Sequence, residues 1–201
     1  MPSTVGSLFE ACGAEWKACA RWGQPLSLTR PGIYVVSGSE DPLDQSPIRG
    51  VAPIAVEAVA KLLAVSNVMV DGTPATPESL AARLAGCRLP DENVLYVGKA
   101  DTSVARRVRQ YVRTPLGARR PHNGGWFLKT LSVLDAVWVH AAETDRPEAA
   151  ERAALECFIA QVSEPTAAAL HDPALPLPFA NLELEKSRRK GHGIRGATAS
   201  R

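Results

Sequence analysis

Hydrophobic and polar residues alternate along the chain with two different periods. Between residues 4 and 21 the apolar positions are three and four apart, which is typical of one face of a helix. Runs of β-branched and aromatic residues predict strands at residues 32–36, 67–70, 93–97 and 135–142. Further helices are predicted at residues 54–65, 77–85, 102–113, 126–131 and 147–163. This mixture predicts an α/β (α+β) fold, in which helices flank a small central sheet.

The predicted helix at residues 102–113 carries its charges in a pattern. Its apolar stripe includes Tyr111, and three arginines gather on the opposite face, namely Arg106, Arg109 and Arg113. Arg107 lies about 40° from Tyr111 around a helix of 3.6 residues per turn, beside the buried edge. Packing can therefore aim Arg107, whereas the other three arginines are expected to face solvent.

The composition is that of an ordinary soluble globular protein. Of the 201 residues, 45% are hydrophobic and 22% are charged, which is enough to build a core and excludes disorder of the whole chain. The best candidate for a membrane span, residues 51–65, is short and contains Glu57 and Lys61, so no membrane association is expected. The first residues lack a basic stretch followed by an apolar run, which predicts a cytoplasmic protein.

Charge is distributed unevenly between the two halves of the chain. Residues 1–95 carry 7 Lys or Arg and 10 Asp or Glu, a net charge of −3, whereas residues 96–201 carry 16 and 11, a net charge of +5. The basic half is therefore where a polyanion site is expected. The alternative is that scattered arginines only solubilise an Ala-rich surface.

Five short motifs follow one another in a distinctive order. One strand carries the motif Gly-Ile-Tyr, which ends at Tyr34, and a later strand carries Tyr-Val-Gly, which begins at Tyr96. Arg107 on a helix, Glu156 on a later helix and Asn181 in Pro-Phe-Ala-Asn-Leu follow. In that order the motifs resemble those of the GIY-YIG nuclease family, especially its excision-repair members and its restriction enzymes. The resemblance implies a mainly antiparallel sheet as the core of the fold.

The resemblance also divides the chain into parts. It covers residues 31–38 and 93–182, so a nuclease core is expected at residues 31–182, after an N-terminal helical extension at residues 1–30 and before a basic tail at residues 183–201. Family members usually join the two Tyr strands by a short hairpin, whereas here 61 residues separate them. Residues 40–90 are therefore expected to form a helical insertion, which governs DNA choice or contacts a protein partner.

The resemblance implies hydrolysis of phosphodiester bonds with Mg²⁺, for which Mn²⁺ can substitute. Glu156 would be the one protein carboxylate on the ion, because Mg²⁺ binds through few protein ligands. Alanines flank Glu156 on the helical wheel and leave room for an ion. Arg107 would hold two phosphate oxygens with its planar guanidinium. The alternatives are an exposed helix carboxylate and an ordinary surface arginine.

The remaining site residues are assigned by the same resemblance. Tyr34 would orient or deprotonate the attacking water and Tyr96 would assist. A phenol is a poor base at neutral pH unless a cation lowers its pKa, and Lys99 or the metal would supply that cation. Asn181 would fix the site through hydrogen bonds. The alternatives are that the two tyrosines are ordinary strand aromatics and that Asn181 is a turn residue.

Basic residues outside this constellation are expected to contact DNA. They are Arg106, Arg109 and Arg113 on the helix, Arg119, Arg120 and His122 in the following loop, and Lys186, Arg188, Arg189 and Lys190 in the tail. The alternatives are a structural loop and a solvated tail. The role of Tyr111, which stands where many relatives carry His, stays open.

The sequence as a whole favours a metal-dependent DNA endonuclease of restriction or genome-maintenance type. One active site cuts one strand, so cleavage of both strands requires a homodimer or successive nicks. A second hypothesis is a catalytically inactive nucleic-acid-binding module on the same fold. A third is a small-molecule enzyme of unrelated fold, which would not bind DNA.

Overall fold

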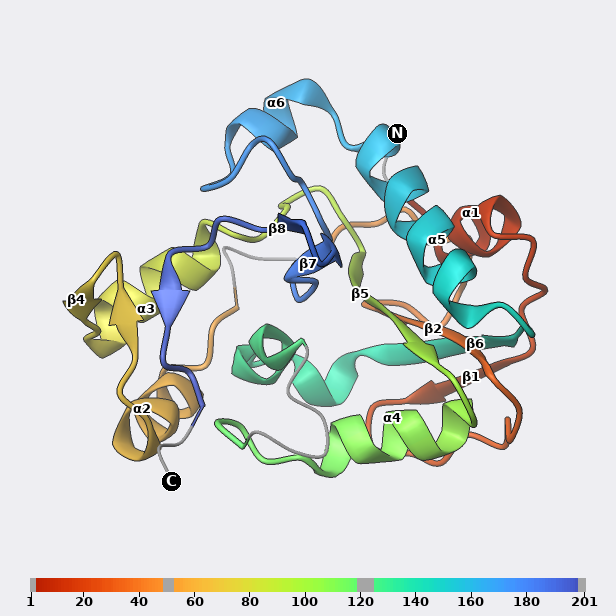
Figure 1. The fold of residues 1–201 in the computed structure, drawn as a ribbon, viewed down its shortest axis with the longest axis horizontal. Coiled ribbons are helices and arrows are strands. Elements are labelled where there is room, and N and C mark those ends of the chain that lie inside the picture. The colour runs from red at the N-terminus through yellow and green to blue at the C-terminus, as the bar shows by residue number, and fades with distance from the viewer. Residues whose placement is uncertain (1–2, 49–52, 119–124, 199–201) are drawn as a thin grey trace.

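The computed structural model describes residues 3–48, 53–118 and 125–198, and it confirms a mixed fold of helices and antiparallel sheets (Figure 1). Its central sheet has four strands, every neighbouring pair antiparallel, in the order β1-β6-β2-β5. The strands are β1 (Ala18–Arg21), β6 (Trp138–Glu143), β2 (Gly32–Ser37) and β5 (Val94–Ala100). In this sheet β5 is an edge strand.

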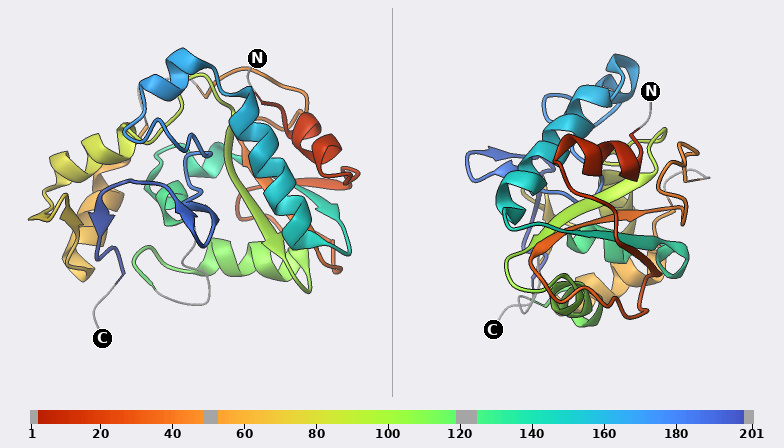
Figure 2. Two further views of the ribbon diagram at one scale, coloured as in Figure 1. Left: turned by 45° about the horizontal axis from the view of Figure 1, so that its top comes forward. Right: turned by 90° about the vertical axis from the view of Figure 1, so that its right-hand side faces the viewer.

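Helices cover both faces of the sheet, as the right-hand view of Figure 2 shows. Alternate residues of β2 point to opposite faces. Tyr34 and Val36 belong to one core cluster, and Ile33 and Val35 to the other. The first cluster includes side chains of α4 (Val104–Arg113) and of the 3₁₀ helix η1 (Trp126–Thr130); the second includes side chains of α1 (Val5–Ala11) and α5 (Pro147–Gln161).

The insertion of residues 40–90 is folded into the first of these cores. It contains α2 (Val56–Val65), α3 (Pro77–Ala85) and the short strands β3 (Met69–Val70) and β4 (Thr73–Pro74). Leu62 and Leu84 are fully buried and belong to the same cluster as Tyr34. Strand β3 also pairs with β9 (Ile194–Arg195) near the far end of the chain. The insertion therefore shares its core with the central sheet.

The structure corrects three expectations about local structure. The helix expected over residues 4–21 ends at Ala11, because Gly13 adopts a φ of 65°, and the chain returns as β1 on the sheet edge opposite β5. The part described as a helical extension is therefore partly strand. Helix α4 is capped by Ser103, whose Oγ accepts from Arg106 N at 3.2 Å, and not by a residue before it. The strand expected from residue 135 begins at Trp138, after the 3₁₀ helix η2 (Leu134–Ala136).

The basic tail is ordered as far as the structure describes it, which is also a correction. After α6 (Glu164–Ala168), strands β7 (Glu183–Glu185) and β8 (Arg188–Arg189) form a hairpin, and β9 follows. The hairpin lies near the β5 edge of the sheet in Figure 1. None of the helices in the described ranges combines the length and the apolar character that crossing a membrane requires.

Both motif glycines are needed for steric reasons. Gly98 pairs with Tyr34 across β2 and β5. A Cβ on Gly98 would lie 2.6 Å from Cε1 of Tyr96 and 2.7 Å from Cζ of Tyr34. A Cβ on Gly32 would lie 2.1 Å from the carbonyl oxygen of Ala142 in β6. The two tyrosine rings therefore lie against glycine backbone, which has room for no other residue type.

We predict that Gly98→Ala destabilises the protein by about 1–3 kcal/mol, the usual cost of overpacking a core. The matched control is Gly86→Ala at the end of α3, where a Cβ would meet nothing closer than 3.6 Å and the backbone is helical. Urea denaturation followed by circular dichroism measures both variants. Equal stability of the two variants would contradict the steric role of Gly98.

Candidate active site

A cavity of about 790 Å³ opens beside the edge strand β5. It lies where α4, on one face of the sheet, and α5, on the other, meet the β7–β8 hairpin. The lining residues are Tyr96, Lys99, Arg107, Gly125, Glu148, Glu151, Arg152, Asn181, Leu182, Glu183, Leu184, Glu185, Lys186, Ser187 and Arg189. Four of the six residues expected to be catalytic are in this set, and Tyr34 and Glu156 are not.

Three buried tyrosines form the wall of the cavity. The ring centroids of Tyr34 and Tyr96 are 5.9 Å apart, and those of Tyr96 and Tyr111 are 5.2 Å apart. Tyr96 lines the cavity, whereas Tyr34 and Tyr111 are 1% and 0% exposed and lie behind it. The attacking water assigned to Tyr34 would therefore meet Tyr96.

Burial decides the protonation of these tyrosines. It raises the pKa of Tyr34 and Tyr96 well above the ordinary value for a phenol, and the charge of Arg107 lowers it only in part. A hydrogen bond between the two hydroxyls raises the pKa of Tyr34 and lowers that of Tyr96. Lys99, expected to supply the activating charge, instead lies 3.5 Å from a carboxylate oxygen of Glu148 and 3.9 Å from one of Asp101. Both phenols are thus protonated at neutral pH.

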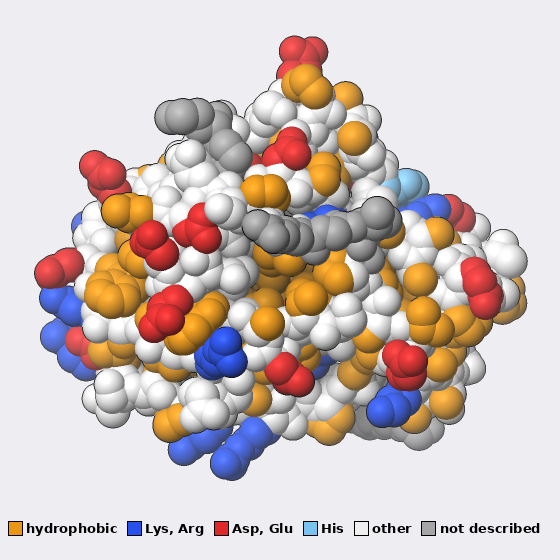
Figure 3. All heavy atoms as spheres, turned by 180° about the vertical axis from the view of Figure 1, so that it is seen from behind, with side chains coloured by type: hydrophobic (Ala, Val, Ile, Leu, Met, Phe, Trp, Pro, Cys, Tyr) orange, Lys and Arg blue, Asp and Glu red, His pale blue; other side chains and the backbone are white. Residues whose placement is uncertain are grey.

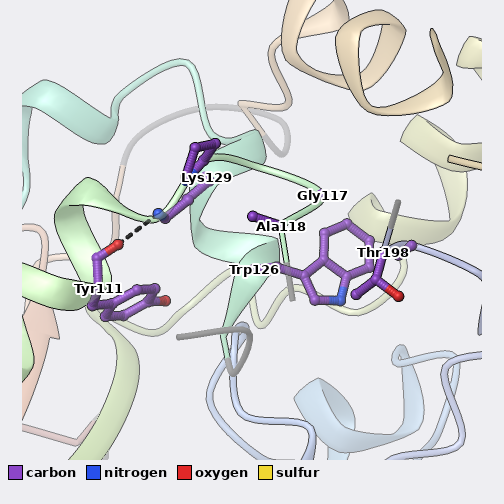
Figure 4. Close-up of a pocket in the computed structure, with 8 residues that line it drawn as sticks. Tyr111, Gly117, Ala118, Trp126, Lys129 and Thr198 are labelled. Atoms are coloured by element: carbon purple, nitrogen blue, oxygen red, sulfur yellow. Dashed lines mark hydrogen bonds between the residues drawn. The ribbon is translucent and has the colours of Figure 1, made fainter. Parts of the chain in front are cut away.

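Tyr111 supports this wall from behind. Its hydroxyl donates to the carbonyl oxygen of Gly125, a residue that has a φ of 66°. Lys129 donates to the carbonyl oxygens of Tyr111, Val112 and Thr114 at the end of α4, and the bond to Tyr111 is drawn in Figure 4. The pocket in that view has a volume of about 10 Å³. It holds no more than one water, so these residues are structural.

Arg107 is placed as the helical pattern predicted. It is half-buried and lines the cavity, whereas Arg106, Arg109 and Arg113 are exposed. Among the described residues, Arg107 has no ion-pair or hydrogen-bond partner for its guanidinium group. A half-buried guanidinium with no carboxylate partner among these residues can bind an anion.

Four glutamates line the cavity, namely Glu148, Glu151, Glu183 and Glu185, and Glu156 is not among them, a position that does not favour its predicted role as metal ligand. Five residues along a helix turn the side chain by about 140°, so the two glutamates cannot share a face. Glu156 is exposed and does not line the cavity, whereas Glu151 does. Sequence reasoning weighed the free space beside Glu156 and overlooked that Glu151 begins the buried stripe continued by Leu155 and Phe158 at i+4 and i+7. A carboxylate in line with buried apolar residues of the same helix was the signal that could have identified Glu151.

Burial also controls the charge of Glu151. It raises the pKa of this carboxyl to about 7, although the charges of Lys99 and Arg107 act in the opposite direction. Its carboxylate forms no ion pair or hydrogen bond with another described residue. Removal from water without a partner disfavours the charged form, and a bound cation reverses that.

Asn181 is bonded to the edge strand of the sheet. Its Nδ2 donates to the carbonyl oxygen of Val97 at 2.8 Å, and its Oδ1 accepts from Val97 N at 2.9 Å. Val97 lies in β5, so the amide takes the place of one residue of a neighbouring strand. This pairing holds the strand that carries Tyr96 and Lys99 against the loop that carries Asn181.

Lys190 is buried, a position that does not favour its predicted contact with DNA. It is 6% exposed, and its Nζ donates to the carbonyl oxygens of Leu177, Pro178 and Phe179 at 3.4, 2.9 and 3.1 Å. Those three residues lead directly into Asn181. The buried lysine therefore stabilises the loop that carries Asn181, and so supports the bonds between Asn181 and Val97.

The other basic candidates have different positions. Lys186, Arg188 and Arg189 are exposed on the β7–β8 hairpin. Arg189 Nε lies 3.2 Å from a carboxylate oxygen of Glu183 in the same hairpin. Arg119, Arg120 and His122 lie outside the described residues.

The residues at the cavity fit a metal ion held mostly by water and substrate. Nowhere in the described part of the chain do three or more Asp, Glu, His or Cys side chains form a group that could hold a metal ion. Glu151 is a single desolvated carboxylate facing a wide polar cavity. Mg²⁺ commonly binds through one or two carboxylates and retains several waters, and such a donor set suits it.

Comparison with known proteins finds no matching family model, no similar curated protein and no similar solved structure. The chemistry of the cavity therefore has to be derived from its own geometry. Tyr96, Arg107 and Glu151 supply a phenol, a guanidinium without an ion pair and an unpaired carboxylate around one space. This set can bind an anion and a cation side by side.

We predict that Glu151→Gln makes the protein more stable at pH 8 than the wild type. A folded-state pKa of about 7 lies above the ordinary value of 4.5, so the wild type loses stability as the pH rises from about 4.5 to about 7. The glutamine variant escapes this loss, on the order of 1–2 kcal/mol after solvent screening. Urea denaturation at pH 4.5 and pH 8 measures the difference, which should vanish at the lower pH.

Glu156→Gln is the matched control, because it removes the same charge from the same helix at an exposed position. It should change stability little at either pH. Added Mg²⁺ should stabilise the wild type at pH 8 and leave Glu151→Gln unchanged. A Glu151→Gln protein no more stable than Glu156→Gln at pH 8 would contradict the desolvation of Glu151.

Proposed function

We propose that this protein is a metal-dependent DNA endonuclease of the GIY-YIG type, which hydrolyses phosphodiester bonds. The observation that carries the proposal is the convergence of Tyr96, Arg107 and Glu151 on one cavity beside an edge strand clamped by Asn181. The order of sequence motifs supports it independently. Restriction or genome maintenance, DNA as the partner and a homodimer belong to the same proposal.

Hydrolysis of a phosphodiester requires a positioned water, neutralisation of charge on the phosphoryl oxygens and a stabilised leaving oxygen. Arg107 binds the phosphoryl oxygens, since its planar guanidinium offers two parallel donors and has no competing ion pair. Mg²⁺, or Mn²⁺ in its place, would be held by Glu151 and would supply Lewis-acid stabilisation of the developing charge. The negative charge of Glu151 is thereby used to bind a cation next to the phosphate.

Tyr96 positions the water. Tyr96 lines the cavity, and burial raises the pKa of its phenol, so the hydroxyl keeps its proton at neutral pH. At neutral pH Tyr96 therefore orients a water or a phosphate oxygen as a donor and does not act as the base. Tyr34 lies behind Tyr96, with the two ring centroids 5.9 Å apart.

The surface around the cavity supports a polyanionic substrate. Arg106, Arg109 and Arg113 lie on the exposed side of α4, next to Arg107. On the face seen from behind in Figure 3, acidic and basic side chains are interspersed, which does not favour polyanion binding there. A protein partner for the insertion would contact its exposed residues, which include the apolar side chains of Leu43, Val56 and Val65.

We predict that purified protein nicks plasmid DNA with Mg²⁺ or Mn²⁺ and does not do so with EDTA. Glu151→Gln should abolish nicking, because the cation loses its carboxylate, and DNA affinity should survive, because the arginines remain. Glu156→Gln should nick at the wild-type rate. The proposal fails if Glu151→Gln retains full activity, and DNA binding without cleavage by the wild type would favour an inactive binding module.

We predict that Arg107→Lys lowers the cleavage rate by a factor on the order of 10² to 10³, because an oriented donor to developing charge is lost. Arg106→Lys, one residue away and exposed, should lower the rate only slightly. Single-turnover rates at saturating protein separate loss of chemistry from loss of binding. Equal defects in the two variants would refute the assignment of Arg107.

A further inference from the structure

Most of the charges that line the cavity are paired with each other. Among the described lining residues, three cations have carboxylate partners, at 3.5 Å for Lys99 and Glu148, 3.6 Å for Arg152 and Glu185, and 3.2 Å for Arg189 and Glu183. The pair of Arg152 and Glu185 crosses from α5 to the β7–β8 hairpin. Arg152 directly follows Glu151 in the sequence, and the motif pattern did not single it out.

We propose that Arg152 is a second phosphate-binding residue, masked in the free protein by Glu185. A phosphate next to the scissile one displaces the Glu185 carboxylate and takes its place on the guanidinium. The ligand is thus a phosphodiester of the nucleic acid held at Arg107, and the inference rests on the proposed function. It adds a subsite for the flanking nucleotide on α5.

The geometry of the pair makes the exchange favourable. The side chains of Arg152 and Glu185 are 53% and 36% exposed, and ion pairs open to water contribute little. Their separation of 3.6 Å exceeds the 2.7–2.9 Å typical of a charge-assisted hydrogen bond, so the carboxylate does not engage the donors closely. A phosphodiester can accept two parallel hydrogen bonds from a guanidinium, and it replaces a loosely held partner.

The other two pairs do not offer the same exchange. Arg189 and Glu183 belong to one hairpin and join β7 to β8, so their pair does not bridge the cavity. Lys99 has a second carboxylate nearby, that of Asp101 at 3.9 Å, and stays neutralised if the first is displaced. Lys186 follows Glu185 on the hairpin and has no ion pair with a described residue, so it adds to the attraction for phosphate at this place.

A double-mutant cycle tests whether Glu185 blocks the binding of phosphate by Arg152. The probe is a fluorescein-labelled DNA duplex of about 20 base pairs, measured by anisotropy in EDTA so that cleavage does not interfere. Glu185→Gln should tighten binding on the order of tenfold, because Arg152 is released. Glu183→Gln removes the same charge from the same hairpin and should tighten binding by about twofold, the general electrostatic effect.

Arg152→Gln should weaken binding on the order of tenfold and reduce the salt dependence of log Kd by about one unit, as expected for one lost phosphate contact. In the Arg152→Gln background, Glu185→Gln should tighten binding no more than Glu183→Gln does. Arg152→Lys keeps the charge and should restore part of the affinity.

Two results would overturn the proposal that Glu185 blocks Arg152. One is equal tightening by Glu185→Gln and Glu183→Gln, and the other is full tightening by Glu185→Gln when Arg152 is absent. The cycle is measured without metal, so loss of the proposed endonuclease activity is a separate result. If Arg152 and Glu185 are coupled in DNA binding but the protein cleaves no DNA, the phosphate subsite stands and belongs to a nucleic-acid-binding module. If no variant binds DNA, both proposals are overturned.

Discussion

The architecture of the site depends on the register between β2 and β5. Gly98 pairs with Tyr34, and the absence of a Cβ lets the rings of Tyr34 and Tyr96 lie against the strand. The same register turns Val35 and Val97 to the opposite face, where they pack in the cluster of α5. A slip by one residue would exchange the two faces. One pairing therefore places the tyrosines on one side of β5 and, through α5, the carboxylate on the other.

An edge strand leaves backbone groups unpaired, and this protein satisfies them with side chains from a distant part of the chain. Asn181 bonds both polar groups of Val97, and Lys190 secures the loop before Asn181. Burial lowers the pKa of Lys190 to about 8, a cost that its three carbonyl partners offset. The C-terminal segment is therefore part of the site, since it covers the edge that would otherwise be open to another strand.

The sequence predicted what local periodicity controls and failed where contacts are distant. The half-burial of Arg107 follows from one helix, so its wheel position was sufficient. Strands β1 and β9 exist because they pair with β6 and β3, and spacings of three and four at residues 4–21 could not reveal the first of these. A run of basic residues predicts side chains that are exposed to solvent. Lys190 is buried instead, because its Nζ donates to backbone carbonyl oxygens that only the folded chain brings near it. Glu156 was preferred to Glu151 because free space was weighed above the continuity of the buried stripe.

The charged residues that line the cavity differ in whether they have an ion-pair partner. Three of its cations have carboxylate partners among the described residues, whereas Arg107 and Glu151 have none. Each of these two is held partly out of water, and burial acts against the charge of Glu151. In the proposed function, Arg107 would hold the phosphate and Glu151 would hold its cation, so that both charges would gain a partner. Charges that the fold has already placed around the cavity would favour such a ligand, because little reorganisation is needed when it binds.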